Sequence, residues 1–408
     1  MNPRIAGSIA DEQAVEGTVE TDGRAIRFIL LLGAVSLFAD MAYEGGRSIV
    51  GPFLGLLGAG GTVVGVLSGF GELAGYGVRF VSGRVADRSR RYWSIATAGY
   101  GLNLLAVPAL ALAGSWPVAA CLVIAERLGK GIRTPARDAL LSHASTRAGA
   151  GRAFGLHEAL DQIGAVAGPL GVSIILAFSA NGYRRAFAAL VVPAIIALAL
   201  LRYARRKYPD PTRFESNAAG SHDSRRHPAF VPYLVAASLV AAGFADFPLV
   251  ALRLQADAVM APTWIPVFYA VAMGTDAGTA IVLGRWFDRS GIAVLIPATL
   301  VSAAFAPLVF GGGPGMALLG ILLWGAGVGA HESVMRAAVA GMAAPGQRAR
   351  AYGLFNGVYG LAWFAGSAVL GVLYDHSRTG MILFSVVAQL AAIPFLIAAV
   401  HRRAGDRA

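Results

Sequence analysis

Residues 83–91 read Gly-Arg-Val-Ala-Asp-Arg-Ser-Arg-Arg, and residues 284–291 read Gly-Arg-Trp-Phe-Asp-Arg-Ser-Gly. Both copies share the order Gly, Arg, two spacers, Asp, Arg and Ser, and each follows a long apolar run. We expect the glycine to let two helices approach closely, the aspartate to lie at the positive N-terminus of the next helix, and the arginines to stay in water. A repeated basic loop of this kind indicates a membrane protein built from two similar halves. The residues to which we assign a conformational role in these loops are Gly83, Asp87, Arg88, Gly284, Asp288 and Arg289.

The composition of the chain favours an integral membrane protein. Of its 408 residues, 56% are hydrophobic and 14% are charged, whereas a soluble protein carries roughly 25% charged residues. The net charge of +11 comes from short basic clusters between apolar runs, so we expect it to orient the protein in a lipid bilayer and expect no nucleic-acid partner. Residues 1–25 contain five acidic residues and lack the pattern of a secretory signal, so we expect a cytoplasmic tail there.

The hydropathy pattern predicts an all-α fold of twelve transmembrane helices, because about twelve apolar runs are long enough to cross a bilayer. We divide the chain into an N-terminal six-helix bundle (26–203), a polar linker (204–229), a C-terminal bundle (230–400) and a short tail (401–408). Basic residues gather on one side of this topology, which predicts that both termini and the linker are cytoplasmic in a bacterial inner membrane. The expected spans are 26–56, 61–82, 93–113, 117–140, 152–178, 184–203, 230–255, 262–283, 291–311, 315–340, 351–374 and 380–400.

Two further echoes support a duplication. The tripeptide Phe-Ala-Asp occurs at residues 38–40 and 244–246, and in both copies an arginine follows the aspartate by seven residues, at Arg47 and Arg253. The pentapeptide Arg-Ala-Phe-Gly-Leu at residues 152–156 returns as Arg-Ala-Tyr-Gly-Leu at 350–354. These matches stay in step over about two hundred residues, so we predict two pseudo-symmetric halves.

Charged residues inside the apolar runs are the candidates for function, because each is costly in lipid unless it is paired or faces water. Asp40, Glu44 and Arg47 are spaced along one helical face, which we expect to line a central cavity. We assign proton coupling to Asp40, Asp161 and Arg127, since an acid in an apolar seam suits a proton carrier and a guanidinium keeps its charge beside it. For each of these residues a purely structural ion pair is the alternative. The expected substrate-binding residues are Glu44, Arg47, Glu72, Asp246, Arg253, Asp276 and Asn356.

The expected fourth span carries Arg127 together with a polar stripe of Glu126, Lys130 and Arg133. A functional stripe would line the cavity, whereas a structural one would reach the inner interface and anchor the helix. The sequence leaves this choice open.

These patterns resemble signatures of the major facilitator superfamily. The repeated basic loop resembles its motif A, and Arg127 with Gly131 partly resembles its motif B. In the fifth span Gly155, Gly164, Gly168 and Pro169 resemble motif C of drug:proton antiporters, although the paired glycines that usually end that motif are missing. The resemblance implies two six-helix bundles that rock about a central cavity.

We therefore expect a proton-coupled exporter of a small organic molecule, with protons as the coupling ion and a monomer as the working unit. The alternatives are an importer or facilitator of a nutrient or organic anion, with Arg47 and Arg253 as anion ligands, and a membrane receptor that transports nothing. Buried acids and arginines are nearly balanced, so the sequence does not fix the charge of the substrate. It has no Gly-rich phosphate loop, no metal-ligand spacing and no nucleophile elbow, so we expect neither an enzyme nor a bound metal or cofactor.

Overall fold

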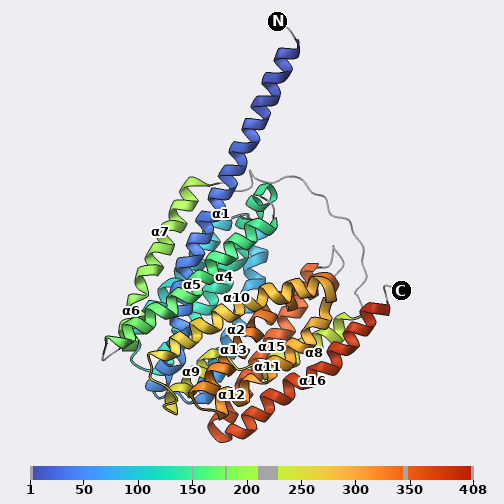
Figure 1. Ribbon diagram of the computed structural model, residues 1–408. Helices are drawn as coiled ribbons and strands as arrows, with labels where there is room; N and C mark the ends of the chain where they lie inside the picture. The colour runs from blue at the N-terminus through green and yellow to red at the C-terminus, as the bar shows by residue number, and fades with distance from the viewer. Residues whose placement is uncertain (1–2, 149, 180–181, 210–227, 343–347, 406–408) are drawn as a thin grey trace.

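The computed structural model describes residues 3–148, 150–179, 182–209, 228–342 and 348–405, and every regular element in this part of the chain is a helix (Figure 1). Apolar segments fold this way because a helix satisfies its own backbone polar groups without water. The N-terminal half contains α1 (Pro3–Leu56), α2 (Gly61–Ser89), α3 (Tyr92–Ala109), η1 (Leu110–Leu112), α4 (Trp116–Ala148), α5 (Ala150–Ala177), α6 (Gly182–Ala189) and α7 (Val191–Lys207).

The C-terminal half contains eleven described elements. They are α8 (Phe230–Gly243), α9 (Phe247–Ala256), α10 (Trp264–Ser290), η3 (Gly291–Val294), α11 (Leu295–Ala303), α12 (Phe305–Gly311), α13 (Pro314–Gly329), the π-helical turn η4 (Ala330–Met335), α14 (Arg336–Met342), α15 (Arg348–His376) and α16 (Arg378–Gly405), with α14 continuing directly from η4.

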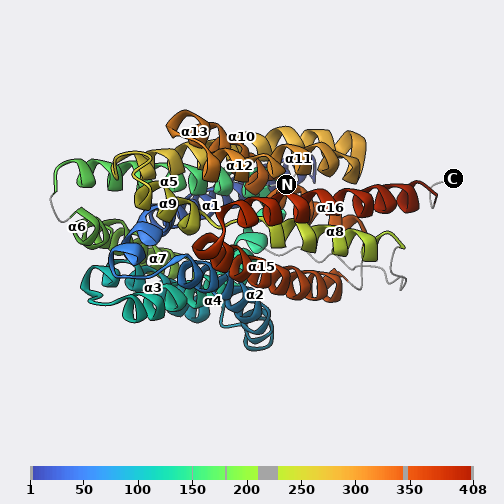
Figure 2. The ribbon, with the colours of Figure 1, turned by 90° about the horizontal axis from the view of Figure 1, so that it is seen from below.

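Each half forms its own bundle, and the two lie side by side (Figures 1 and 2). One buried cluster includes Phe28 and Tyr100 of the N-terminal half, and another includes Tyr233 and Phe355 of the C-terminal half. Figure 1 shows the start of α1 and the ends of α7 and α16 on one side of the molecule, which we call the terminal face. The other side, where α2, α10 and α13 begin, is the opposite face.

Hydropathy identifies nine membrane-span candidates within the described residues. One of them, Trp264–Gly311, covers two of the expected spans, and the remaining two expected spans fall on α2 and α4, whose charged residues lower their hydropathy. The protein is therefore multi-pass, and the count of twelve stays a prediction. In the most apolar window of Phe230–Ala256 72% of the residues are buried, against 28% for Arg378–Arg402, so α8 and α9 are central while α16 presents apolar side chains outward, as lipid contact requires.

Three local features differ from the expected elements. Helix α1 begins at Pro3, so the segment expected as a separate tail continues the first helix beyond the bundle (Figure 1). The expected span 230–255 is interrupted at residues 244–246, which separate α8 from α9. Helix α13 passes into the π-helical turn η4, an insertion that is frequent at functional sites. Most of the expected linker lies outside the described residues.

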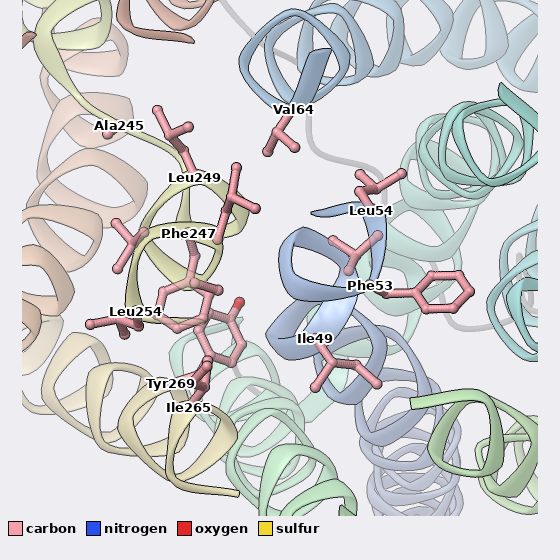
Figure 3. Packing of buried hydrophobic residues seen from close by; sticks show 14 of the residues in the cluster. Ile49, Phe53, Leu54, Val64, Ala245, Phe247, Leu249, Leu254, Ile265 and Tyr269 are labelled. Carbon is pink, nitrogen blue, oxygen red and sulfur yellow. The ribbon is translucent and has the colours of Figure 1, made fainter. Parts of the chain in front are cut away.

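The two halves meet closely at the opposite face. Figure 3 shows Ile49 and Val64 of the N-terminal half on the side of an apolar group from α9 and α10, whereas the Phe53 ring points away from that group, toward Phe187. Gly51 allows this approach, because a Cβ atom there would lie 1.9 Å from the carbonyl oxygen of Pro248. The apolar group of the C-terminal half includes Phe247, Leu249, Leu254, Ile265 and Tyr269.

A carboxylate of the C-terminal half also caps a helix of the N-terminal half at this face. Asp375 accepts hydrogen bonds from the backbone N–H groups of Gly61 and Thr62, both at 2.8 Å, and from the Thr62 hydroxyl at 2.6 Å. A negative charge at a helix N-terminus is favourable because it meets unpaired N–H groups and the positive end of the helix dipole. Beside it, Gly65 and Gly371 let α2 and α15 approach so closely that neither position has room for a Cβ atom.

Candidate functional site

A cavity of about 410 Å³ lies between the two halves. Its lining comes from the middle of α1, α2, α4, α5, α10, α13 and α15 and from the parts of these helices nearer the terminal face, whereas the opposite face is sealed by the contacts described above. The volume falls in the range of sites for small molecules. The sequence-predicted residues that line the cavity are Asp40, Glu44, Arg47, Glu72, Arg127, Asp161, Asp276 and Asn356.

Two of the expected binding residues do not belong to this lining. Asp246 is 3% exposed and lies behind the cavity wall, where its carboxylate accepts hydrogen bonds from Trp363 Nε1 at 2.9 Å and Ser367 Oγ at 3.1 Å. Arg253 lies near the opposite face, where it donates to the carbonyl oxygen of Gly312 at 2.9 Å. The two arginines of the Phe-Ala-Asp repeat therefore occupy different environments, and of the two only Arg47 reaches the cavity.

Three cations surround Tyr43 on the N-terminal wall. Arg127 donates to the Tyr43 hydroxyl, Arg47 Nη1 lies 3.4 Å from the same oxygen, and Lys130 Nζ lies 3.7 Å from the centre of the ring. Glu72 forms a close ion pair with Arg127 Nη1 at 2.8 Å. The group concentrates positive charge where an anion can be held.

The other carboxylate distances in this group are longer. Arg47 Nη2 lies 3.8 Å from Glu72 and 3.6 Å from Asp246, and Lys130 Nζ lies 3.9 Å from Glu44. Glu44 accepts a hydrogen bond from the hydroxyl of Tyr269, across the interface between the halves, at 2.5 Å. Since charge-assisted hydrogen bonds are about 2.7–2.9 Å long, Arg47 and Lys130 are held loosely by these acids.

Two acidic residues lie side by side in the wall that the N-terminal half contributes, on the side nearer the terminal face. The carboxyl groups of Asp40 on α1 and Asp161 on α5 are neighbours in the cavity wall. Two neighbouring carboxylates repel each other when both are ionised, and one proton between them relieves this repulsion. Arg133 Nη2 lies 3.3 Å from Asp40 Oδ1, and its guanidinium carbon lies 4.5 Å from the centre of the Tyr100 ring. The pair can therefore hold a proton next to a fixed positive charge.

The C-terminal wall is aromatic. Phe244, Trp324, Tyr359 and Trp363 line the cavity, and the Phe244 ring lies 5.7 Å from that of Trp324 and 5.9 Å from that of Trp363. Trp324 Nε1 donates to the carbonyl oxygen of Ala245 at 2.8 Å, so this wall also holds the interruption between α8 and α9. Asp276 is the acidic residue that the described part of this half contributes to the lining, beside His331 of the π-helical turn.

The glycines with an expected conformational role fall into two groups. A Cβ atom at Gly164 would lie 2.1 Å from the carbonyl oxygen of Leu37, and one at Gly168 would lie 2.2 Å from that of Met41, so both make close α1–α5 packing possible. Gly83 faces Pro135 of α4 at ordinary contact distance. Gly155 and Gly284 have no such neighbour within 4 Å, so the structure gives them no packing role.

The aspartates of the repeated basic loop do not form the expected helix caps. Asp87 lies in the last turns of α2 and Asp288 in those of α10, whereas α3 and η3 begin later, at N-cap residues Arg91 and Ser290, and have no side-chain cap. The aspartate precedes the end of its helix, so it is too early in the chain to cap the next one. Arg88 and Arg289 lie in these same last turns, next to the negative end of the helix dipole. Pro169 lies inside α5, beside the seam that Gly168 forms.

Several residues that line the cavity were not among the predicted site residues. The sequence left open whether Lys130 and Arg133 line the cavity or anchor α4 at the membrane interface, and the structure places both on the cavity. Arg133 is only 1% exposed, so it does not reach the membrane interface. Lys130 is one of only two lysines in an arginine-rich chain, which is a signal of its own. Tyr43, Trp324 and Trp363 carried no signal, because an aromatic residue in an apolar run looks the same whether it faces lipid, core or cavity. Within the described residues no group of three or more His, Cys, Asp and Glu is arranged to hold a metal ion.

Comparisons with known proteins agree with this architecture. The chain is 42% identical over 380 residues to an uncharacterized protein of Mycobacterium bovis, covering 92% of this chain and 93% of that one. It is 24% identical over 396 residues to an uncharacterized MFS-type transporter of Methanocaldococcus jannaschii, covering 94% and 98% of the two chains.

Solved transporters share the fold at low identity. The nucleoside transporter NupG matches with a TM-score of 0.70 at 13% identity, covering 92% of this chain and 98% of its own. A POT family transporter in complex with 5-aminolevulinic acid matches with a TM-score of 0.71 at 13% identity, covering 91% and 95%.

The family model of the Major Facilitator Superfamily matches residues 36–367, from the middle of α1 to α15. This range contains the cavity, both repeated loops and the interface between the halves. The chain therefore belongs to the Major Facilitator Superfamily and is a multi-pass membrane transporter, not an enzyme.

Proposed function

We propose that this protein is a proton-coupled exporter of a small organic molecule that works by alternating access. The observation that carries the proposal is the contact between Asp40 and Asp161 in the cavity wall. A proton shared between α1 and α5 can leave only if a carboxylate then finds a positive partner, and Arg133 is that partner for Asp40. Protonation and local ion pairing are therefore coupled in the wall that also faces the substrate.

The alternating-access part of the proposal is supported by the seal at the opposite face. By the positive-inside rule the terminal face is cytoplasmic, because its described residues include Arg84, Arg88, Arg205, Arg206 and Arg289. In that orientation this conformation is closed toward the outside. Opening outward requires the breaking of the contacts of Asp375, Glu44 and Gly51 with the other half.

Export is supported by the close packing of α5 on α1 at Gly164 and Gly168, the part of the chain that resembles the antiporter signature. In the proposed cycle a proton from outside binds the Asp40–Asp161 pair and substrate is released outward. Loss of the proton to the cytoplasm then resets the carrier. The same site can also serve proton-coupled import of an organic anion, and the loosely held cations Arg47 and Lys130 favour that second candidate.

The test is substrate accumulation in efflux-deficient cells that produce the wild type, Asp161→Asn or the control Asp257→Asn, whose carboxylate lies at the opposite face. For a compound the protein exports, we expect lower accumulation with the wild type and the control, and loss of this difference with Asp161→Asn or a protonophore. Raised accumulation would reverse the direction to import. Export by Asp161→Asn that is unchanged and still sensitive to the protonophore would remove Asp161 from the coupling site.

A further inference from the structure

We propose that the substrate is an aromatic organic anion, with its carboxylate or similar group on Arg47 and Lys130 and its ring on the aromatic C-terminal wall. This inference rests on the proposed transport function and names the substrate class of the same cavity. It begins from the different chemistry of the two walls.

The anionic end is assigned by the distances around the cations. Among the described residues, the nearest carboxylate oxygen lies 3.6 Å from Arg47 and 3.9 Å from Lys130, so neither cation has a short charge-assisted bond to a protein acid there. Arg47 Nε is also buried without a hydrogen-bond partner. Their side chains are 17% and 27% exposed, as expected for groups at a cavity surface. Arg127, by contrast, is already held by Glu72 at 2.8 Å.

The protein's own acids near these cations have other partners. Glu44 accepts from Tyr269, and Asp246 accepts from both Trp363 and Ser367. Moving either acid to a cation would break those bonds, whereas an incoming carboxylate brings new acceptor oxygens. A bound anion can therefore hydrogen-bond to Arg47 and Lys130 without drawing Glu44 or Asp246 away from these partners.

The aromatic end is assigned by the opposite wall. Among the described residues, the six Lys and Arg side chains that line the cavity come from the N-terminal half, and the C-terminal half supplies Phe244, Trp324, Tyr359 and Trp363 instead. Offset stacking and edge contacts with such rings favour a flat aromatic group. Asp276 on this wall disfavours a second negative group there, so the anion must lie toward the N-terminal half.

Four probes separate the parts of this inference: naphthaleneacetate, its neutral amide, naphthalenemethylamine and the aliphatic octanoate. Binding is measured as the thermal stabilisation of the purified, detergent-solubilised full chain. We expect naphthaleneacetate to bind most tightly, because only it presents both a carboxylate and a ring. Equal or tighter binding of the amine or the amide would overturn the anionic assignment, and equal binding of octanoate would overturn the aromatic one. No binding by any probe at millimolar concentration would overturn both.

The variants Arg47→Gln and Lys130→Gln should each weaken naphthaleneacetate binding by about tenfold or more, since each removes a charged hydrogen bond. Their matched controls are Arg253→Gln, at the repeat-related position that the structure keeps out of the cavity, and Lys207→Gln, the other lysine of the chain. Neither control should change the affinity. Equal losses in a variant and its control would place the anion elsewhere.

The test of the substrate class can fail or succeed independently of the test of the proposed function. Selective, Arg47-dependent binding without any proton-driven transport would keep the substrate class and overturn the coupling. Proton-driven transport of naphthalenemethylamine alone would do the reverse.

Discussion

The two halves of this transporter differ in the walls that they present to the cavity. The N-terminal half supplies Arg47, Arg127, Lys130 and Arg133 with their acids, and the described C-terminal half supplies Trp324, Trp363 and other aromatic side chains. The backbone scaffolds are similar, because α5 packs on α1 through Gly168 as α15 packs on α8 through Gly366. The comparison teaches that the duplicated packing seams have been kept while the surfaces facing the substrate have diverged.

The repeated tripeptide shows this divergence at one position. In the N-terminal half Asp40 lies in the continuous helix α1, close to Arg133 and Asp161. In the C-terminal half Asp246 is the N-cap of α9, at an interruption, and is held by Trp363 and Ser367. The same residue type is therefore a candidate proton carrier in one half and a structural anchor in the other.

A bulky side chain in either packing seam, α1–α5 at Gly168 or α8–α15 at Gly366, should destabilise the protein to the same extent, and this is the largest effect we expect. Gly168→Val and Gly366→Val should each lower the stability by about 2–3 kcal/mol, because the new side chain meets backbone of the neighbouring helix that cannot move aside. In both cases a Cβ atom would lie about 2 Å from a carbonyl oxygen, 2.2 Å at Gly168 and 2.1 Å at Gly366. Thermal unfolding in detergent measures the loss.

Gly155→Val is the matched control for the seams, since no atom outside its own helix lies within 4 Å of a Cβ there. It should unfold close to the wild-type temperature. A large loss of stability for Gly168→Val with none for Gly366→Val would show that the packing of the two halves is not equivalent. That result would contradict the comparison.

The two repeat-related acids should separate stability from coupling. Asp246→Asn should destabilise the protein by about 1–3 kcal/mol, because it weakens a buried network that includes two hydrogen bonds and the pair with Arg47. Asp40→Asn should change stability less and abolish concentrative transport, which a pH gradient of one unit sustains at about tenfold. Thermal unfolding and transport in proteoliposomes with an imposed pH gradient measure the two effects. Concentrative transport by Asp40→Asn at the wild-type level would contradict the division of roles.

The helix cap at the opposite face should have the smallest effect. Asp375→Asn leaves an acceptor for Gly61 and Thr62 but removes the charge, so we expect a shift of about 1 kcal/mol toward the state open at that face. The repeat of residues 152–156 at 350–354 places the neutral Ala177 of α5 at the position that matches Asp375, and within the described residues α10, which corresponds to α2, has no side-chain cap.

Spin labels at Leu112 and Met316, which are 84% and 54% exposed near the opposite face, report this shift as a longer label-to-label distance. The labelled protein needs Cys121→Ala, because Cys121 is the chain's own cysteine and is exposed. The control Asp257→Asn, also at this face, keeps the cap intact. An unchanged distance distribution for Asp375→Asn would show that the apolar seal alone holds the face closed.

Much of the architecture could be predicted from the sequence. Apolar length predicted membrane helices, the echoes at residues 83–91 and 284–291 predicted two halves, and the cost of buried charge singled out Asp40, Glu44, Arg47, Glu72 and Asp161, all of which line the cavity. These predictions succeed because lipid leaves an apolar backbone segment little choice but a helix and makes each buried charge a costly exception.

The contact partners of the charged side chains were not predictable to the same extent. The sequence placed Glu44 and Arg47 on one face of α1, but their partners come from other helices: Glu44 contacts Tyr269 and Lys130, while Arg47 contacts Glu72 and Asp246. Spacing along one helix shows which side chains share a face but not what the neighbouring helices bring to it. Asp87 and Asp288 are a similar case, since their helices end after them rather than before.

The sequence by itself determined that this chain is a membrane protein with two similar halves, and that its first half carries charged residues within apolar segments. Only the tertiary structure decided that Arg47 faces a cavity while Arg253 does not, and that Asp40 meets Asp161 while Asp246 meets Trp363. The physical reason is that helix formation in lipid depends on local composition, whereas the partners of a side chain depend on contacts between distant segments, such as Glu44 and Tyr269, which are 225 residues apart.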